Sequence, residues 1–292
     1  MPACLRDALS QADAILLLDG PLGTRLVDHG FEVDRPGWSA RALLEAPELV
    51  ERIHREYVAA GSQLLTANTF RTHQRNLDAW GQYQRAEELT HLAVSLARRA
   101  AGNQAWVAGS VAPIGDCYSP EQVLEESRLI EEHGRMVENL VAAGVDAVLL
   151  ETHVSLKELE IAAAAAARHR LPLLISVTTM DGIRMLDGTP LSTLGGIVQA
   201  YAPAAVGVNC LPAERVAGSL QALRRSTSLP LLVYANSGER TPEGKWIPSL
   251  GADVAAHARE ARAWRRLGMR ILGGCCGTTP ELIAKFSREF RD

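Results

Sequence analysis

Eight short apolar runs alternate with longer amphipathic segments along almost the whole sequence. The runs lie at residues 15–20, 63–70, 105–112, 147–152, 172–179, 204–210, 230–237 and 270–277. Segments with helical spacing follow them at 47–60, 84–101, 120–143, 156–170, 189–202, 213–226, 252–267 and 280–290. Continuous apolar runs such as AVLLE are typical of parallel strands buried on both faces. The alternation therefore predicts one domain over residues 1–292, an α/β chain forming a single (β/α)8 TIM barrel, with a doubly wound open sheet as the alternative.

Several of the expected helices begin with capping signals. Ser119, followed by a proline and by Gln122, reads as an N-cap with a capping-box partner and predicts that a helix begins at residue 120. Ser155 with Glu158 forms a second capping-box pattern. A threonine and a proline at 279–280 open the last helix in the same way.

The composition is that of an ordinary globular protein, with 47% hydrophobic and 22% charged residues and a net charge of −4. No run of lysine or arginine suggests a nucleic-acid partner, and no uncharged apolar stretch approaches the roughly 18 residues of a membrane span. The first twenty residues lack the plan of a signal peptide, because acidic residues flank their short apolar run. We therefore expect a cytoplasmic protein with a small-molecule substrate, and neither nucleic acid nor membrane as partner.

The five cysteines carry the clearest chemical signal. An odd number in a chain of 292 residues argues against a disulfide framework. Cys210 ends one expected strand, and Cys275 and Cys276 end another; in a (β/α)8 barrel such strand ends meet at one rim. Three thiolates with one open position suit a catalytic zinc ion, although a cysteine pair alone could be two small buried side chains. We assign no role to Cys4 or Cys117.

Six motifs give the sequence a family resemblance. They are GVNC at 207–210, GGCCGTTP at 273–280, LLDGPLGTRL at 17–26, PGWSARALLEAPELV at 36–50, TANTF at 66–70 and YANSGE at 234–239. Together they resemble the homocysteine S-methyltransferase family. The resemblance implies a zinc barrel in which Cys210, Cys275 and Cys276 bind the metal and Asn236 is a fourth ligand when substrate is absent. It also implies methyl transfer to the homocysteine thiol, giving methionine.

The resemblance extends to residues that would bind the amino acid. Glu151, at the end of the fourth strand, resembles the acidic residue that binds the amino group of homocysteine, and Asp19 is its expected companion. Helix capping or structural hydrogen bonding is the alternative for both carboxylates. Thr66 and Ser110 are expected to donate hydrogen bonds to the substrate carboxylate. A lone histidine is more often a satisfied or solvated side chain than a ligand, and this is the favoured interpretation of His153, with a contact to substrate at the mouth as the alternative.

The methyl donor is the least constrained part of the prediction. Because the sequence ends with the last barrel helix, we expect neither the folate and cobalamin domains of methionine synthase nor the C-terminal extension of the betaine-dependent members. S-methylmethionine or S-adenosylmethionine is then the expected donor, with segment 238–251 as a lid or an ordinary surface loop. A partner of a separate corrinoid protein, an enzyme acting on another thiol and a purely structural zinc barrel remain as alternatives, and the oligomeric state is undetermined.

Overall fold

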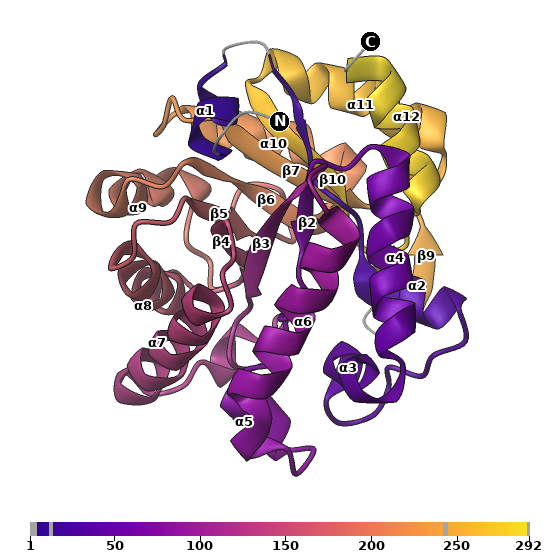
Figure 1. The fold of residues 1–292 in the computed structure, drawn as a ribbon. Helices are drawn as coiled ribbons and strands as arrows, with labels where there is room; N and C mark the ends of the chain where they lie inside the picture. Colours follow the sequence, from indigo (N-terminus) through magenta and orange to yellow (C-terminus); the bar gives the residue numbers. More distant parts are fainter. Residues whose placement is uncertain (1–4, 12–13, 242–244, 291–292) are drawn as a thin grey trace.

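The computed structural model describes residues 5–11, 14–241 and 245–290, and its parallel strands form a barrel (Figure 1). The barrel strands are β1 Leu16–Leu17, β2 Leu64–Thr66, β3 Trp106–Val111, β4 Ala147–His153, β5 Leu173–Val177, β6 Ala205–Pro212, β7 Leu231–Asn236 and β10 Met269–Gly274. They are hydrogen-bonded in the order β1-β10-β7-β6-β5-β4-β3-β2. A parallel bridge between Leu18 and Leu64 joins the two end strands, so the sheet closes. The (β/α)8 prediction is confirmed, and the open sheet is excluded.

Helices follow every strand and cover the outside of the barrel. They are α4 Pro47–Ala60, α6 Ala86–Ala101, α7 Glu126–Ala142, α8 Leu156–Ala167, α9 Leu194–Tyr201, α10 Ala213–Arg224, α11 Val254–Arg266 and α12 Pro280–Phe290. Shorter helices α2 Leu22–Asp28, α3 Ala42–Glu45 and α5 Gln74–Asp78 lie in the connections after β1 and β2. Within the described part of the chain, no helix is both long and apolar enough to cross a membrane.

One predicted helix start is wrong and one predicted capping interaction does not form, for a local reason in each case. Residues 120–122 form only a 3₁₀ turn and α7 begins at Glu126, because the Ser119 hydroxyl donates to Asp116 (2.9 Å) rather than capping a helix. Helix α8 begins after Ser155 as expected, but without a side-chain cap. The Glu158 carboxylate instead accepts from the Ile114 backbone N–H at 2.7 Å. The last helix begins at Pro280, as predicted.

The core has two layers, as alternation along the strands requires. On β4, Val148 and Leu150 pack outward against the helices, while Ala147 and Leu149 point into the barrel. Continuing this alternation by one step directs Glu151 inward, at the carboxyl end of the strand. The position of this carboxylate thus follows from the period of two that also builds the core.

A short helix that the sequence did not predict, α1 Leu5–Ser10, packs at the amino-terminal end of the barrel. Leu5 is buried in the interior cluster together with Leu16 and Trp106. Figure 1 places α1 at the opposite end of the barrel from α3 and α5. The carboxyl ends of the strands therefore remain the open end, which is where (β/α)8 enzymes place their active sites.

Candidate metal centre and substrate pocket

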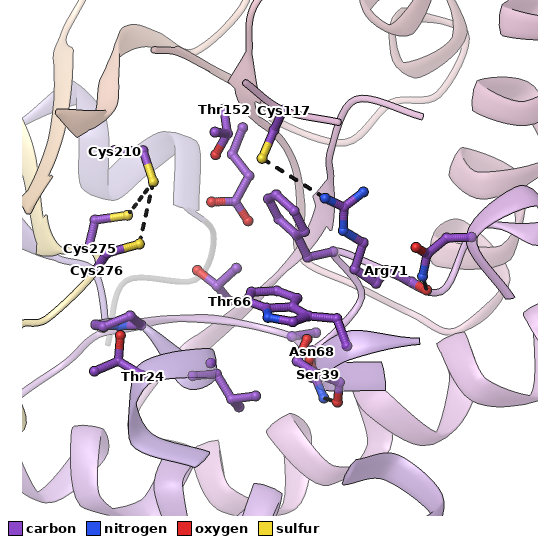
Figure 2. A pocket seen from close by; sticks show the side chains of 18 of the residues that line it. Thr24, Ser39, Thr66, Asn68, Arg71, Cys117, Thr152, Cys210, Cys275 and Cys276 are labelled. Atoms are coloured by element: carbon purple, nitrogen blue, oxygen red, sulfur yellow. Dashed lines mark hydrogen bonds between the residues drawn. The ribbon is translucent and has the colours of Figure 1, made fainter. Parts of the chain in front are cut away.

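Three cysteines meet at the carboxyl end of the barrel. Cys210 lies near the end of β6, and Cys275 and Cys276 follow β10 directly. The Cys210 sulfur is 3.2 Å from the sulfur of Cys275 and 3.7 Å from that of Cys276 (Figure 2). All three sulfur atoms lie within 4.8 Å of one another, and they form the one group among the described residues with the make-up of a metal site. The sequence expectation that these thiols converge is confirmed.

An irregularity in β6 turns Cys210 toward its partners. The pairing of β6 with β7 shifts register between Asn209 and Pro212, and Cys210 has a φ of 59°. This left-handed conformation is uncommon for a residue with a side chain and marks a local constraint. The alternation of side chains along β6 points residue 209 into the barrel. The bulge after it directs the next side chain, that of Cys210, to the rim.

The same irregularity occurs two strands away and is tied to the first. Thr152 has a φ of 60°, and the β4 register shifts between Leu150 and His153. The Asn209 amide links both sites, since its oxygen accepts from the Thr152 N–H (3.0 Å) and its nitrogen donates to the Thr152 hydroxyl (2.7 Å). Asn209 therefore holds the ends of β4 and β6 together.

Strand β7 runs beside the cysteine pair and places Asn236 there. The Cys275 N–H donates to the carbonyl of Ala235 (2.9 Å), and the Ser237 N–H donates to the carbonyl of Cys276 (2.9 Å). Asn236 lies between these two bonds, and its side-chain oxygen is buried without a hydrogen-bond partner. A buried oxygen acceptor without a partner costs free energy, so such an atom is expected to have one in the functional protein. A metal ion bound to the neighbouring thiols would be such a partner.

The thiols themselves also fit a cation. Hydrogen bonds shared with Cys275 and Cys276, together with burial, hold the pKa of the Cys210 thiol well above its usual value. Three thiolates this close repel one another, so they become stable together when a bound cation neutralises their charge.

The Glu151 carboxylate lies inside the barrel mouth and is hydrogen-bonded on both oxygens. Ser110 donates to one oxygen, and the Tyr234 hydroxyl donates to the other at 3.0 Å. Burial raises the pKa of Glu151, while these two hydrogen bonds act in the opposite direction. No ion pair neutralises this side chain within the described residues.

Asp19 forms a second buried carboxyl group at the mouth. It accepts hydrogen bonds from the Thr66 backbone N–H (2.8 Å) and from the Thr66 hydroxyl (2.9 Å). Burial nevertheless raises the pKa of Asp19 to about 8, and the charge of Glu151 adds to this effect. Two buried acids without a cationic partner among the described residues favour a positively charged ligand between them.

A single pocket of about 700 Å³ connects these groups. Its inner wall contains the three cysteines and the two acids, and its outer wall contains Trp38, Phe70 and Tyr118. The rings of Trp38 and Phe70 lie 5.7 Å apart, and the Tyr118 hydroxyl is 3.6 Å from the Cys210 sulfur. The thiol group, the two acids and an aromatic wall thus share one cavity, which is large enough for two small molecules.

The structure also places His153 and the two cysteines outside the group of three, as far as they are described. His153 does not line the pocket: it is fully buried, and its Nε2 atom lies 3.3 Å from the carbonyl oxygen of Val111, so the interpretation as a satisfied histidine is confirmed and the alternative of a contact with substrate is not. The β4 bulge, which the sequence does not reveal, turns this side chain away. Cys117 lines the pocket but stands outside the group of three thiols. Cys4 lies outside the described residues, and the other four cysteines are free.

The described residues of segment 238–251 form a two-stranded hairpin rather than an open loop. Strands β8 Gly238–Arg240 and β9 Trp246–Pro248 pair antiparallel. A Cβ atom added to Gly277 would come within 2.8 Å of the Trp246 ring, so the hairpin packs against the turn after the cysteine pair. None of its described residues lines the pocket.

Two residues of the site were missed at the sequence level. Tyr234 lies in the YANSGE motif and Asn209 in GVNC, but neither was singled out. Both face the barrel interior at the end of a strand, among buried neighbours. A polar side chain that continues the inward series of an apolar strand was the available signal.

Comparison with known proteins agrees with this geometry. The family model described as homocysteine S-methyltransferase matches residues 16–290. A curated homocysteine S-methyltransferase from Escherichia coli is 33% identical, with 96% of each chain covered. The Bacillus subtilis homocysteine S-methyltransferase YbgG is 30% identical over 94% of this chain and 93% of its own.

Two solved structures of one related enzyme match the chain over almost its whole length. The crystal structure of the E. coli homocysteine methyltransferase MmuM in its metallated form matches with a TM-score of 0.84 and 31% identity, covering 97% of this chain and 99% of that one. Its oxidised form matches with a TM-score of 0.86. With the family model spanning nearly the whole barrel, the protein is a member of the homocysteine S-methyltransferase family of enzymes.

Proposed function

We propose that this protein transfers a methyl group from a small sulfonium donor to the thiol of homocysteine, producing methionine. The observation that carries the proposal is the group of three thiols, which opens into the same pocket as two buried carboxyl groups. The acceptor requires both features, because homocysteine has a soft sulfur at one end and an ammonium group at the other.

We further propose that the metal is zinc, bound by Cys210, Cys275 and Cys276 with Asn236 as the fourth ligand in the absence of substrate. Thiolates and a tetrahedral site suit this ion, and three cysteines leave one position that substrate can take. When bound, zinc supplies a deprotonated acceptor sulfur at neutral pH, where a free thiol is only a few per cent ionised. The unpaired oxygen of Asn236 supports its place in the ligand set.

The chain's own residues then bind and orient the acceptor. Glu151 and Asp19 are proposed to bind its ammonium group, because neither of these buried carboxyl groups has a cationic partner among the described residues. Thr66 and Ser110 were expected to contact the substrate carboxylate, but their hydroxyls donate to Asp19 and Glu151 respectively. We therefore assign both hydroxyls to positioning the two acids.

Replacing Glu151 by Gln is expected to lower kcat/KM for homocysteine by about 10- to 100-fold, since a charge-assisted hydrogen bond contributes about 1.5–3 kcal/mol. Steady-state kinetics at saturating donor measures the change. Tyr234→Phe is the matched control: it removes a hydrogen bond to the same carboxylate but keeps the charge, and a smaller effect is expected. Equal kcat/KM values for wild type and Glu151→Gln would remove Glu151 from acceptor binding.

The outer pocket supports a cationic donor. Trp38, Phe70 and Tyr118 present aromatic faces, which attract sulfonium and other onium groups. A sulfonium donor leaves as a neutral thioether, so its departure needs no proton and the pocket needs no general acid. Orientation of the methyl group toward the acceptor sulfur is then the main requirement.

The test is a donor panel with zinc-loaded protein and homocysteine. S-methylmethionine, S-adenosylmethionine, betaine and methyltetrahydrofolate are offered separately, and methionine formation is measured. We expect methionine with at least one sulfonium donor and none with methyltetrahydrofolate. Methionine appearing only with methyltetrahydrofolate, or only after addition of a corrinoid protein, would establish the carrier-dependent alternative instead.

A further inference from the structure

Arg71 places a positive charge in the lining of the pocket. It donates to the carbonyl of Gly115 at 3.1 Å and approaches the Cys117 sulfur at 3.9 Å, and its guanidinium carbon lies 5.0 Å from the centre of the Phe70 ring. No carboxylate forms an ion pair with it among the residues that the structure describes. These contacts fix the orientation of the group while leaving its charge uncompensated.

Two other arginines line the pocket, and they differ in whether an acidic residue pairs with them. Arg35 also lines the pocket, but Glu45 neutralises it at 3.0 Å. Arg75, on α5, lines the pocket as well and has no ion-pair partner within the described part of the chain. The pocket lining therefore contains two arginines, Arg71 and Arg75, without an ion-pair partner among the described residues.

Arg71 stands across the pocket from the metal-binding thiols. Figure 2 shows Arg71 and Cys117 on one side and the three clustered cysteines on the other. The loop of residues 115–118 spans the distance, because its first residue contacts Arg71 and its last, Tyr118, contacts Cys210. A donor molecule between the two sides would present its methyl group to the thiols and its far end to Arg71.

We propose that Arg71, assisted by Arg75, binds a carboxylate on the methyl donor and so selects carboxylate-bearing sulfonium compounds. The inference rests on the proposed function and names the chemical class of its donor. A guanidinium matches a carboxylate in shape and can donate two parallel hydrogen bonds to it. The aromatic wall would hold the sulfonium, while Arg71 fixes the end of the molecule farthest from the thiols.

The experiment compares two donors that differ only in this charge, S-methylmethionine and its primary carboxamide. Wild type, Arg71→Met, Arg71→Lys and Arg75→Met are assayed with zinc and homocysteine, and binding of each donor to the same proteins is measured by calorimetry. Arg128→Met is the control, since that arginine is exposed on α7 beside Glu131 and lies outside the pocket.

Wild type is expected to prefer the carboxylate donor by about 10- to 100-fold in kcat/KM, the usual range for a charge-assisted hydrogen bond. Arg71→Met should abolish the preference, because kcat/KM should fall far more for the carboxylate donor than for the carboxamide, while the KM for homocysteine changes little. Arg71→Lys should retain part of the preference, Arg75→Met should reduce it less, and Arg128→Met should not alter it.

Two results would overturn the proposal. Equal losses with both donors in Arg71→Met would mean that Arg71 only supports the 115–118 loop, and an increase in the homocysteine KM alone would assign Arg71 to the acceptor. The proposed function fails separately, if wild type transfers no methyl group from any sulfonium. Calorimetry would in that case still decide whether the pocket prefers the carboxylate over the carboxamide.

Discussion

Zinc-loaded Cys276→Ala protein is expected to lose its metal and its methyl transfer together, while keeping a folded barrel. The substitution removes one of three thiols that lie within 4.8 Å of one another. Even residues that only orient metal ligands change affinity by about 10- to 100-fold, so loss of a ligand should exceed about 100-fold. The barrel should persist because its interior cluster is built mainly from side chains below the rim. Metal analysis after dialysis, methionine formation and circular dichroism measure the three parts.

Cys117→Ala is the matched control for metal content. It removes a buried thiol from the same pocket, but one that stands outside the metal group, so the variant should keep its full complement of metal. Full zinc occupancy in Cys276→Ala would exclude this cysteine from the ligand set. Loss of metal from Cys117→Ala would show that the pocket wall, rather than three defined ligands, controls binding.

Gly207→Ala is expected to have the largest effect on stability, about 3 kcal/mol or more, because overpacking against backbone cannot be relieved by a rotamer change. A Cβ atom at this position of β6 would lie 1.7 Å from the carbonyl oxygen of Leu232 on β7. The two strands would have to separate just below Cys210, so metal affinity should fall as well. Chemical denaturation with zinc present measures the first effect, and metal titration the second.

Gly218→Ala provides the comparison for that experiment. Gly218 lies on α10, and a Cβ atom there would meet nothing within 4 Å. Alanine favours a helix over glycine by up to about 1 kcal/mol, so this variant should be as stable as wild type or more so. Similar stabilities for the two variants would contradict the steric reason given for the glycine of the GVNC motif.

The strands and the three cysteines were predictable because each depends on a local pattern. An apolar run buried on both faces appears in the sequence as a continuous stretch, and eight such runs leave few folds to consider. Cys210 and Cys276 are 66 residues apart, yet both end strands of one barrel, so topology alone brings them together.

The parts that could not be predicted depend on contacts between distant segments. Glu158 follows a serine in a capping pattern, but its carboxylate accepts from Ile114, 44 residues away. His153 lies near the end of an apolar run, but the bulge in β4 shifts its register, and the side chain does not line the pocket. Tyr234 acquires its role only because barrel closure brings it opposite Glu151, 83 residues earlier. Local patterns contain no information about such pairings.

The Asn209 amide connects the two ends of the proposed acceptor site through its hydrogen bonds. Its hydrogen bonds hold the Thr152 bulge, next to Glu151, against the strand that carries Cys210. A change at either strand end would disturb the bonds that fix the other. Metal and amino acid should therefore bind cooperatively: whichever arrives first restricts the motion of both strand ends, and the second ligand then loses less conformational entropy. By thermodynamic reciprocity, each would raise the affinity for the other by the same factor.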